Sequence, residues 1–189
     1  MKSQQEAISY ILITAIIVVV VATAYIWASP MIQKNSDRAI LNNAYEFMKN
    51  LNEKIKSVAN NGGRESVSID FGNLVFENGA IVFSIETLST IYEPGRRIYF
   101  IKNPNCHLYD NCILGEDEPE LFYVESRKIG EKYYTTYYLT YRKLNSPNQS
   151  YKISLEGQKQ VGKGKIIIEY KGNRKEENMI ISIIEIKIV

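Results

Sequence analysis

The sequence predicts an α+β protein in which one long N-terminal helix packs on a mostly antiparallel β-sheet domain. Residues 7–32 carry no charge, residues 33–62 repeat apolar side chains at helical spacing, and residues 63–189 alternate apolar and polar side chains between turn signals. We therefore expect four parts: a short cytoplasmic leader (1–6), a transmembrane helix (7–32), an amphipathic helix (33–62) and a β-rich extracellular domain (63–189).

The apolar segment is predicted to be a retained membrane helix. As a helix, residues 7–32 would be about 39 Å long, more than the ~30 Å hydrocarbon core of a bilayer. A cleaved secretory signal has a shorter apolar region and a small-x-small site before a polar start. Tyr25 and Trp27 suit an aromatic belt at the membrane interface, and Pro30 is expected to kink or break the helix just beyond it.

The next helix is predicted to be amphipathic. Ser36 or Asp37 is expected to cap its start, and Gly62 and Gly63 supply the flexible backbone that ends it. Its apolar residues recur every three or four positions and form one stripe: Ile40, Ala44, Phe47, Met48, Leu51, Ile55 and Val58. We expect this stripe to pack on its own domain.

The remaining chain is predicted to form roughly seven or eight strands. Asn78-Gly79 between two alternating runs indicates a two-residue hairpin, and Gly72-Asn73 indicates a second turn or a bulge. Further strands are expected in RRIYFIKN, and in ELFYVESRK and EKYYTTYYLTYRKL around Ile129-Gly130. Two closing strands are expected to join across Gly172-Asn173, and QVGKGK is interpreted as a hairpin turn rather than a phosphate loop because Walker spacing is absent.

The two cysteines, Cys106 and Cys112, are separated by five residues and flanked by Pro, Asn and Asp, which suits a small loop closed by a disulfide. A disulfide is the first interpretation, a pair of free thiols the second and a metal site the last, because His107 is the only histidine and a metal needs more ligands. A disulfide would put this domain outside the cytosol.

The sequon Asn148-Gln149-Ser150 predicts an N-glycosylation site and the same location. The positive-inside rule discriminates little, since Lys2 lies on one side and Lys34 and Arg38 on the other. Because the cysteines and the sequon favour the outside for this domain, the N-terminus is expected inside.

The order of these parts resembles the archaeal type IV pilin-like proteins with class III signal peptides. The residues that carry the resemblance are Lys2 and Ser3, then Gln4 as the new first residue, then Glu6 and the apolar run. The resemblance implies that a prepilin peptidase cuts the Ser3–Gln4 bond on the cytoplasmic side and that the helix stays in the mature protein. The chain departs from the family pattern because Ser3 replaces the usual Gly or Ala, and Glu6 would be third after the cut instead of fifth.

Glu6 has two interpretations. By analogy with the family, its carboxylate pairs with the freed amine of Gln4 on a neighbouring subunit, because a carboxylate in an apolar environment is costly unless paired. For a single-pass anchor, it lies instead in the lipid headgroup zone. The expected partners are accordingly like or related pilin subunits, prepilin peptidase and the lipid membrane.

No other pattern in the chain predicts a cofactor, a metal or a catalytic site. The 23 basic and 21 acidic residues are mixed along the chain, which argues against a nucleic-acid partner. The acidic run GEDEPE at residues 115–120 is interpreted as a solvated loop rather than a Ca²⁺ site. YYTTYYLTY is interpreted as a strand with tyrosines on both faces, and stacking on sugars or bases is the alternative.

The predicted function is therefore structural. The chain would be a subunit of an archaeal type IV pilus or related surface filament, anchored by and assembling through its N-terminal helix, with an adhesive role included. The alternative is a single-pass membrane-anchored extracellular binding module that does not polymerise, for example a carbohydrate binder that uses the tyrosines. An extracytoplasmic enzyme comes last. The expected location is the cell membrane, or an extracellular filament after assembly.

Overall fold

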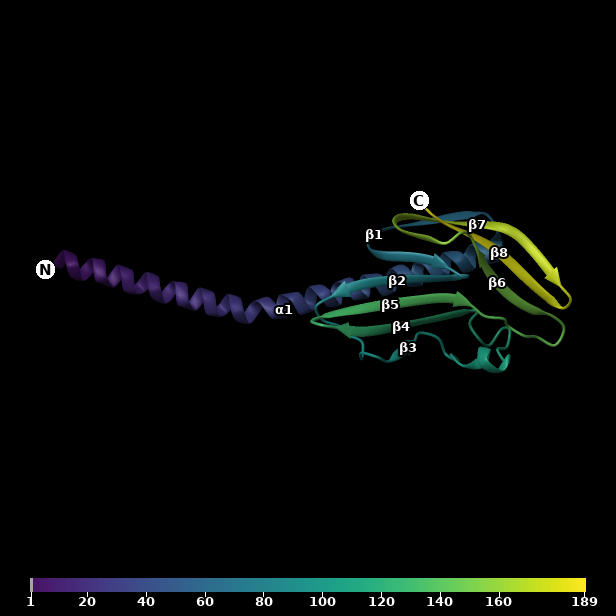
Figure 1. Ribbon diagram of the computed structural model, residues 1–189, viewed down its shortest axis with the longest axis horizontal. Coiled ribbons are helices and arrows are strands. Elements are labelled where there is room, and N and C mark those ends of the chain that lie inside the picture. Colours follow the sequence, from purple (N-terminus) through teal and green to yellow (C-terminus); the bar gives the residue numbers. More distant parts are fainter. Residues whose placement is uncertain (1) are drawn as a thin grey trace.

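The computed structural model in Figure 1 describes the backbone of residues 2–189 and the side chains of residues 10–162 and 164–189. One helix, α1 (Lys2–Asn61), runs through the molecule, and a β-rich head packs against its C-terminal half. The N-terminal half projects away from the head, with no strand beside it (Figure 1). The predicted α+β class is confirmed: one long helix lies on a mostly antiparallel sheet.

The helix is continuous across the predicted junction. Pro30 lies inside it and lacks the N–H that would bond to the preceding turn. Figure 1 shows a bend in the projecting half but no break. The predicted cap at Ser36 or Asp37 is wrong, because both residues lie within the helix and Asp37 is buried against the head. The predicted end is confirmed, since Gly62 and Gly63 follow the last helical residue with φ of 75° and 89°.

Eight strands form one sheet in the order β3-β4-β5-β2-β1-β7-β8-β6. Neighbouring strands are antiparallel, except that β6 is parallel to β8. A short 3₁₀ helix, η1 (Cys106–Tyr109), lies between β3 and β4. The strands are β1 (Arg64–Glu77), β2 (Ala80–Thr87), β3 (Arg97–Tyr99), β4 (Glu120–Ile129), β5 (Lys132–Tyr141), β6 (Ser150–Glu156), β7 (Gln160–Glu176) and β8 (Met179–Ile188).

Two of the predicted turns form as local sequence indicates. Asn78 and Gly79 have φ of 54° and 71° and join β1 to β2, as a two-residue hairpin with positive φ at both positions requires. Of the two interpretations of Gly72-Asn73, the bulge is correct, because the register of β1 against β7 shifts between Ile69 and Leu74. The tight turn after Ile129 joins β4 to β5.

Four details of the predicted sheet are wrong. Gly172 is a bulge inside β7, and the turn to β8 comes later, at Glu177 and Asn178. QVGKGK is not a hairpin turn, because it lies inside β7. A Cβ on Gly164 would lie 2.5 Å from the carbonyl oxygen of Val189, so the close approach of the chain end requires glycine there. The run RRIYFIKN yields only the three residues of β3, and β6 was not assigned from the sequence.

The core lies between the sheet and the predicted apolar stripe of α1. Five residues of the stripe are buried: Ala44, Met48, Leu51, Ile55 and Val58. They pack with sheet residues that include Phe76, Phe83, Val124 and Tyr137. Side chains of β5 alternate as predicted, so that Tyr137 and Tyr141 point into the core while Tyr134 and Tyr138 lie on the other face of the sheet.

Candidate functional site

The most unusual surface of this molecule is the projecting half of α1. Across residues 10–32, the large apolar side chains are 53–75% exposed, on every side of the helix. An isolated apolar side chain on a surface is common, but a contiguous apolar surface of this size is not, and it marks a contact with lipid or protein. Its length and composition are sufficient to cross a membrane.

Two threonine hydroxyls in this half bond to carbonyls of the helix itself. The hydroxyl of Thr14 donates to the carbonyl of Tyr10 at 2.8 Å, and the hydroxyl of Thr23 donates to the carbonyl of Val19 at 2.8 Å. A helix in lipid must satisfy its polar groups internally, because the hydrocarbon offers no partners. These two residues therefore fit an apolar environment as well as their aliphatic neighbours do.

The residues predicted for processing and assembly lie before this surface. Lys2, Ser3, Gln4 and Glu6 fall within α1, but their side chains lie outside the described residues. Their predicted roles therefore stay predictions.

Where α1 meets the head, Asp37 joins the helix to the loop after β2. One carboxylate oxygen accepts hydrogen bonds from the backbone N–H of Ser89 at 2.7 Å and from its hydroxyl at 3.0 Å. The other oxygen accepts from Nε2 of Gln33 at 2.9 Å. The two bonds from Ser89 hold the loop to the helix, and the bond from Gln33, which lies on α1 itself, orients the carboxylate. Hydrogen bonds to charged groups are stronger than those between neutral groups.

A second polar cluster lies deeper, between α1, β4 and β5. Oε1 of Glu120 accepts from Nδ2 of Asn52 at 2.8 Å and from Nζ of Lys56 at 2.9 Å. The hydroxyl of Tyr141 donates to Oδ1 of Asn52 at 2.7 Å. Burial raises the pKa of Tyr141 well above its ordinary value, and the charge of Glu120 adds to this. The interpretation of GEDEPE as a solvated loop is wrong for Glu120, which is buried at the start of β4.

Tyr137 makes the third polar contact between the sheet and α1. Its hydroxyl donates to the carbonyl of Leu41 at 2.8 Å and lies 3.0 Å from the hydroxyl of Tyr92. Since Tyr137 has one proton to donate, Tyr92 is the donor in the second bond. Burial raises the pKa of Tyr137 far above its ordinary value, and the bond with Tyr92 raises it further.

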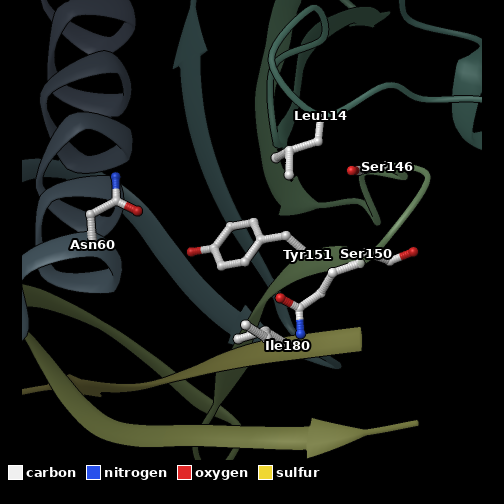
Figure 2. Close-up of a pocket in the computed structure, with 7 residues that line it drawn as sticks. Asn60, Leu114, Ser146, Ser150, Tyr151 and Ile180 are labelled. Atoms are coloured by element: carbon white, nitrogen blue, oxygen red, sulfur yellow. The ribbon is translucent and has the colours of Figure 1, made fainter. Parts of the chain in front are cut away.

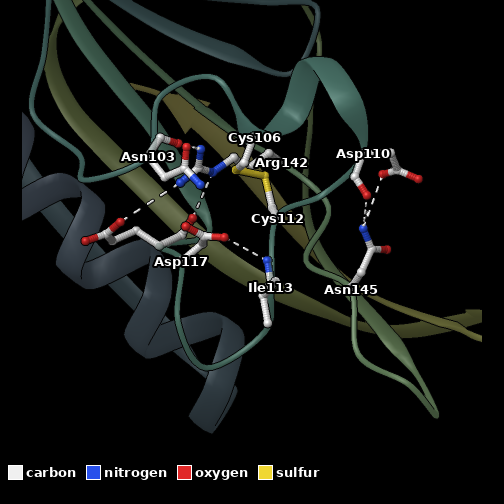
Figure 3. Close-up of a disulfide and its surroundings, with 9 residues drawn as sticks. Asn103, Cys106, Asp110, Cys112, Ile113, Asp117, Arg142 and Asn145 are labelled. Carbon is white, nitrogen blue, oxygen red and sulfur yellow. Dashed lines mark hydrogen bonds and ion pairs between the residues drawn. A yellow bond between two sulfur atoms is a disulfide. The ribbon is translucent and has the colours of Figure 1, made fainter.

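At the far end of the head, a disulfide joins Cys106 to Cys112 (Figure 3). The bond is buried with Leu144 in a small apolar cluster of its own. Asp117 comes within 4.8 Å of the two sulfurs, which suggests a metal site by distance alone. However, the disulfide leaves no thiolate to bind a metal, and Oδ2 of Asp117 accepts from the backbone N–H of Ile113 at 2.7 Å.

The disulfide loop is held to the head by Arg142. Its guanidinium donates to the carbonyls of Asn103 and Glu118, on the two sides of the loop. Burial lowers the pKa of Arg142, which the nearby carboxylates oppose. Asn145 adds a bond from its backbone N–H to the carbonyl of Cys112 at 2.7 Å. Sequence reasoning did not find Arg142, because a basic residue at a strand end usually faces water.

The same end of the head holds the predicted glycosylation site and a pocket. Asn148 is exposed in the bend before β6. Figure 2 shows the pocket, of about 450 Å³, between the end of α1, the disulfide loop and the first residues of β6 and β8. No charged side chain is among its lining residues, which are Asn60, Leu114, Ser146, Gln149, Ser150, Tyr151 and Ile180.

A row of tyrosines crosses the face of the sheet opposite α1. The rings of Tyr99 and Tyr123 lie 5.4 Å apart, and those of Tyr123 and Tyr138 lie 4.8 Å apart and are stacked. The guanidinium of Arg97 lies 4.7 Å above the ring of Tyr123. These half-buried rings form a continuous aromatic surface on β3, β4 and β5.

Comparison of the chain with protein-family models, with curated proteins and with solved structures finds no match.

Proposed function

We propose that this protein is a pilin-like structural subunit of an archaeal type IV pilus or a related surface filament. One observation carries the proposal: a single continuous helix is apolar and exposed over its first half and is built into the core of the head over its second half. Lipid would cover the exposed half before assembly, and like helices would cover it in a filament, because water disfavours apolar surface at about 25 cal/mol per Å².

The way α1 is attached to the head supports a structural role. Asp37, Asn52 and the carbonyl of Leu41 each bond to a loop or strand of the head. Helix and head would therefore move as one body when the exposed half is held in a membrane or in a filament core.

The proposal extends to processing and location. Prepilin peptidase would cut the Ser3–Gln4 bond after the leader that carries Lys2. The amine of Gln4 would then pair with Glu6 of a neighbouring subunit. The head would lie outside the cell, where the Cys106–Cys112 disulfide is stable and Asn148 can receive a glycan.

N-terminal mass spectrometry of the full chain, expressed with and without a prepilin peptidase, tests the processing step. We expect the loss of Met1, Lys2 and Ser3 only when the peptidase is present. An intact N-terminus under both conditions would favour the single-pass anchor. Release of a soluble product that begins near Pro30 would contradict both proposals.

A matched pair of glutamate variants tests assembly. We expect Glu6→Gln to be processed but to fail to enter filaments, because the charge that pairs with the new amine is lost. Glu53→Gln is the control, since Glu53 lies on the exposed polar face of the same helix. Equal filament yields from both variants would refute the proposed role of Glu6.

The aromatic row on the sheet favours a second candidate function, a membrane-anchored module that binds carbohydrate and does not polymerise. Tyr123 stacks on Tyr138 and lies under Arg97, so these half-buried rings present apolar edges and hydroxyls, which suit contact with sugars. A glycan array probed with the detergent-solubilised chain and with Tyr123→Ala would test it. Binding that Tyr123→Ala abolishes and Tyr109→Ala retains would support this function.

A further inference from the structure

The end of the head that faces the projecting half of α1 carries exposed apolar side chains on two separate loops. We name this end the rim: it comprises residues 88–96, between β2 and β3, and the turn between β4 and β5 (Figure 1). Leu88 and Ile91 in the first loop are 52% and 45% exposed, and Ile129 at the turn is 62% exposed.

Hydrogen bonds fix the position of the first loop along the axis of α1, relative to the apolar half of the helix. Ser89 is bound to Asp37 through both its N–H and its hydroxyl. Asp37 lies five residues after Ile32, where the uncharged run ends, which is about 7.5 Å along the helix. The headgroup layer on each side of a bilayer is about 5–8 Å thick, so a helix that spans the hydrocarbon with residues 10–32 places Ser89 within that layer.

The turn between β4 and β5 lies at about the level of Leu88, because Thr87 pairs with Tyr133 and the last pair of β4 and β5 is Ile129 with Lys132. The loop crosses β4 at Ser126, whose carbonyl accepts from the N–H of Gly95 at 2.7 Å. From there β4 continues for three residues to Ile129, up to about 10 Å of extended chain. β4 runs toward the N-terminal end of α1 (Figure 1), so Ile129 at the end of β4 would lie in the same headgroup layer as Leu88 and Ser89.

The charges near the rim suit lipid phosphates. Lys34 and Arg38 on α1 and Lys128 on β4 are exposed at this end. Of the two acidic residues of the rim, Glu93 pairs with Arg96, and Glu131 in the turn is exposed. Glu86, just before the rim, pairs with Lys132, so the basic side chains at this end outnumber the acidic ones. Basic side chains beside apolar ones are the composition of surfaces that lie in a membrane interface.

We propose that the rim is a second membrane-contacting surface, which inserts Leu88, Ile91 and Ile129 into the headgroup layer of the bilayer that α1 spans. This inference rests on the proposed membrane anchor. The rim would hold the head at a fixed tilt on the membrane until the subunit enters a filament.

Tryptophan fluorescence of the full-length chain in vesicles of phosphatidylcholine and phosphatidylglycerol tests the inference. Trp27 is the single tryptophan, so Trp27→Phe provides a silent background for Leu88→Trp or Ile129→Trp. The matched control is Leu108→Trp, because Leu108 is 64% exposed at the opposite end of the head. Lipids with a nitroxide near the headgroup quench tryptophans at that depth, and lipids with a nitroxide on the acyl chain quench Trp27, which lies five residues before Ile32.

We expect quenching and a blue-shifted emission maximum for Leu88→Trp and Ile129→Trp, and neither change for Leu108→Trp. Quenching of Trp27 in the parent chain reports the anchor separately. If Trp27 is quenched but the rim variants behave like Leu108→Trp, the rim inference is refuted and the anchor stands. If Trp27 is not quenched, the anchor fails and the rim inference fails with it.

Discussion

The two halves of α1 share one helix but are stabilised by different forces. Residues 10–32 are apolar on all sides and exposed, and their hydrogen bonds lie within the helix. From Asp37 to Ala59, one side is buried in the head, and Asp37, Asn52 and the carbonyl of Leu41 bond to distant strands or loops. A helix that is apolar on all sides requires an apolar environment. The packed half of α1 does not, because the head of the same chain covers its apolar side.

This contrast teaches that burial cannot be inferred from hydrophobicity alone. The more apolar half is the exposed half, because no strand of the head extends beside it (Figure 1). Mutations in the two halves should therefore affect different properties: membrane insertion for the first and folding of the head for the second.

The largest expected effect is the loss of unfolding free energy when a core side chain is removed from the packed half of α1. Leu51→Ala should lower the unfolding free energy of the head by about 2–5 kcal/mol, because Leu51 is buried between α1 and the sheet. Val19→Ala should leave it unchanged, since Val19 is exposed. Chemical denaturation in mild detergent measures both. Similar losses from the two variants would abolish the distinction.

The reciprocal test places a charge in the exposed half. Val19→Arg should reduce membrane insertion by about 2.5–3.5 kcal/mol, the cost of arginine at the centre of a membrane helix, while the thermal midpoint of the head stays the same. Lys49→Arg, on the exposed face of the packed half, should change neither. Flotation with vesicles measures insertion. If Val19→Arg floats like the parent chain, residues 10–32 do not span the bilayer.

The junction between the halves should show a smaller effect. Asp37→Ala leaves the half-buried N–H of Ser89 without its acceptor, so we expect a loss of about 1.5–3 kcal/mol. Asp37→Asn keeps one carbonyl oxygen and should lose less. Faster hydrogen exchange at the Ser89 amide would locate the loss at the rim. Unchanged exchange in Asp37→Ala would mean that the loop is held by other contacts.

The smallest effect concerns pH. The pKa of Tyr137 is raised in the folded protein, so the unfolded chain releases this proton first, near the ordinary tyrosine value of about 10. The contribution of Tyr137 to stability should be constant below pH 10 and fall as pH rises above it. Tyr137→Phe should cost about 0.5–1.5 kcal/mol at neutral pH and make the alkaline fall shallower. An equally steep fall in both proteins would assign it to other groups, for example Tyr141.

Much of the fold could be predicted because its signals are local. Spacing of three and four residues predicted the stripe from Ile40 to Val58, and Asn78-Gly79 predicted a hairpin that needs two residues with positive φ. Gly172 shows where such signals fail. It resembles a turn residue, but pairing with β8 continues past it and makes it a bulge.

The candidate site also has parts that could be predicted from the sequence and parts that could not. The apolar run, the cysteine loop and Asn148 could be located from the sequence, because each is defined by neighbouring residues. The roles of Asp37, Glu120 and Arg142 could not, since charged residues are usually exposed and nothing local marks these three as buried.

The sequence by itself determined the helix, its two kinds of surface and the alternation of the strands, because backbone preference and side-chain period act over a few residues. Only the tertiary structure decided which charged and polar groups are buried and what they bind. Asn52 meets Glu120 across 68 positions and Tyr141 across 89 positions of the chain. Such pairs form because a buried polar group must find a partner, and only the folded sheet brings that partner to the helix.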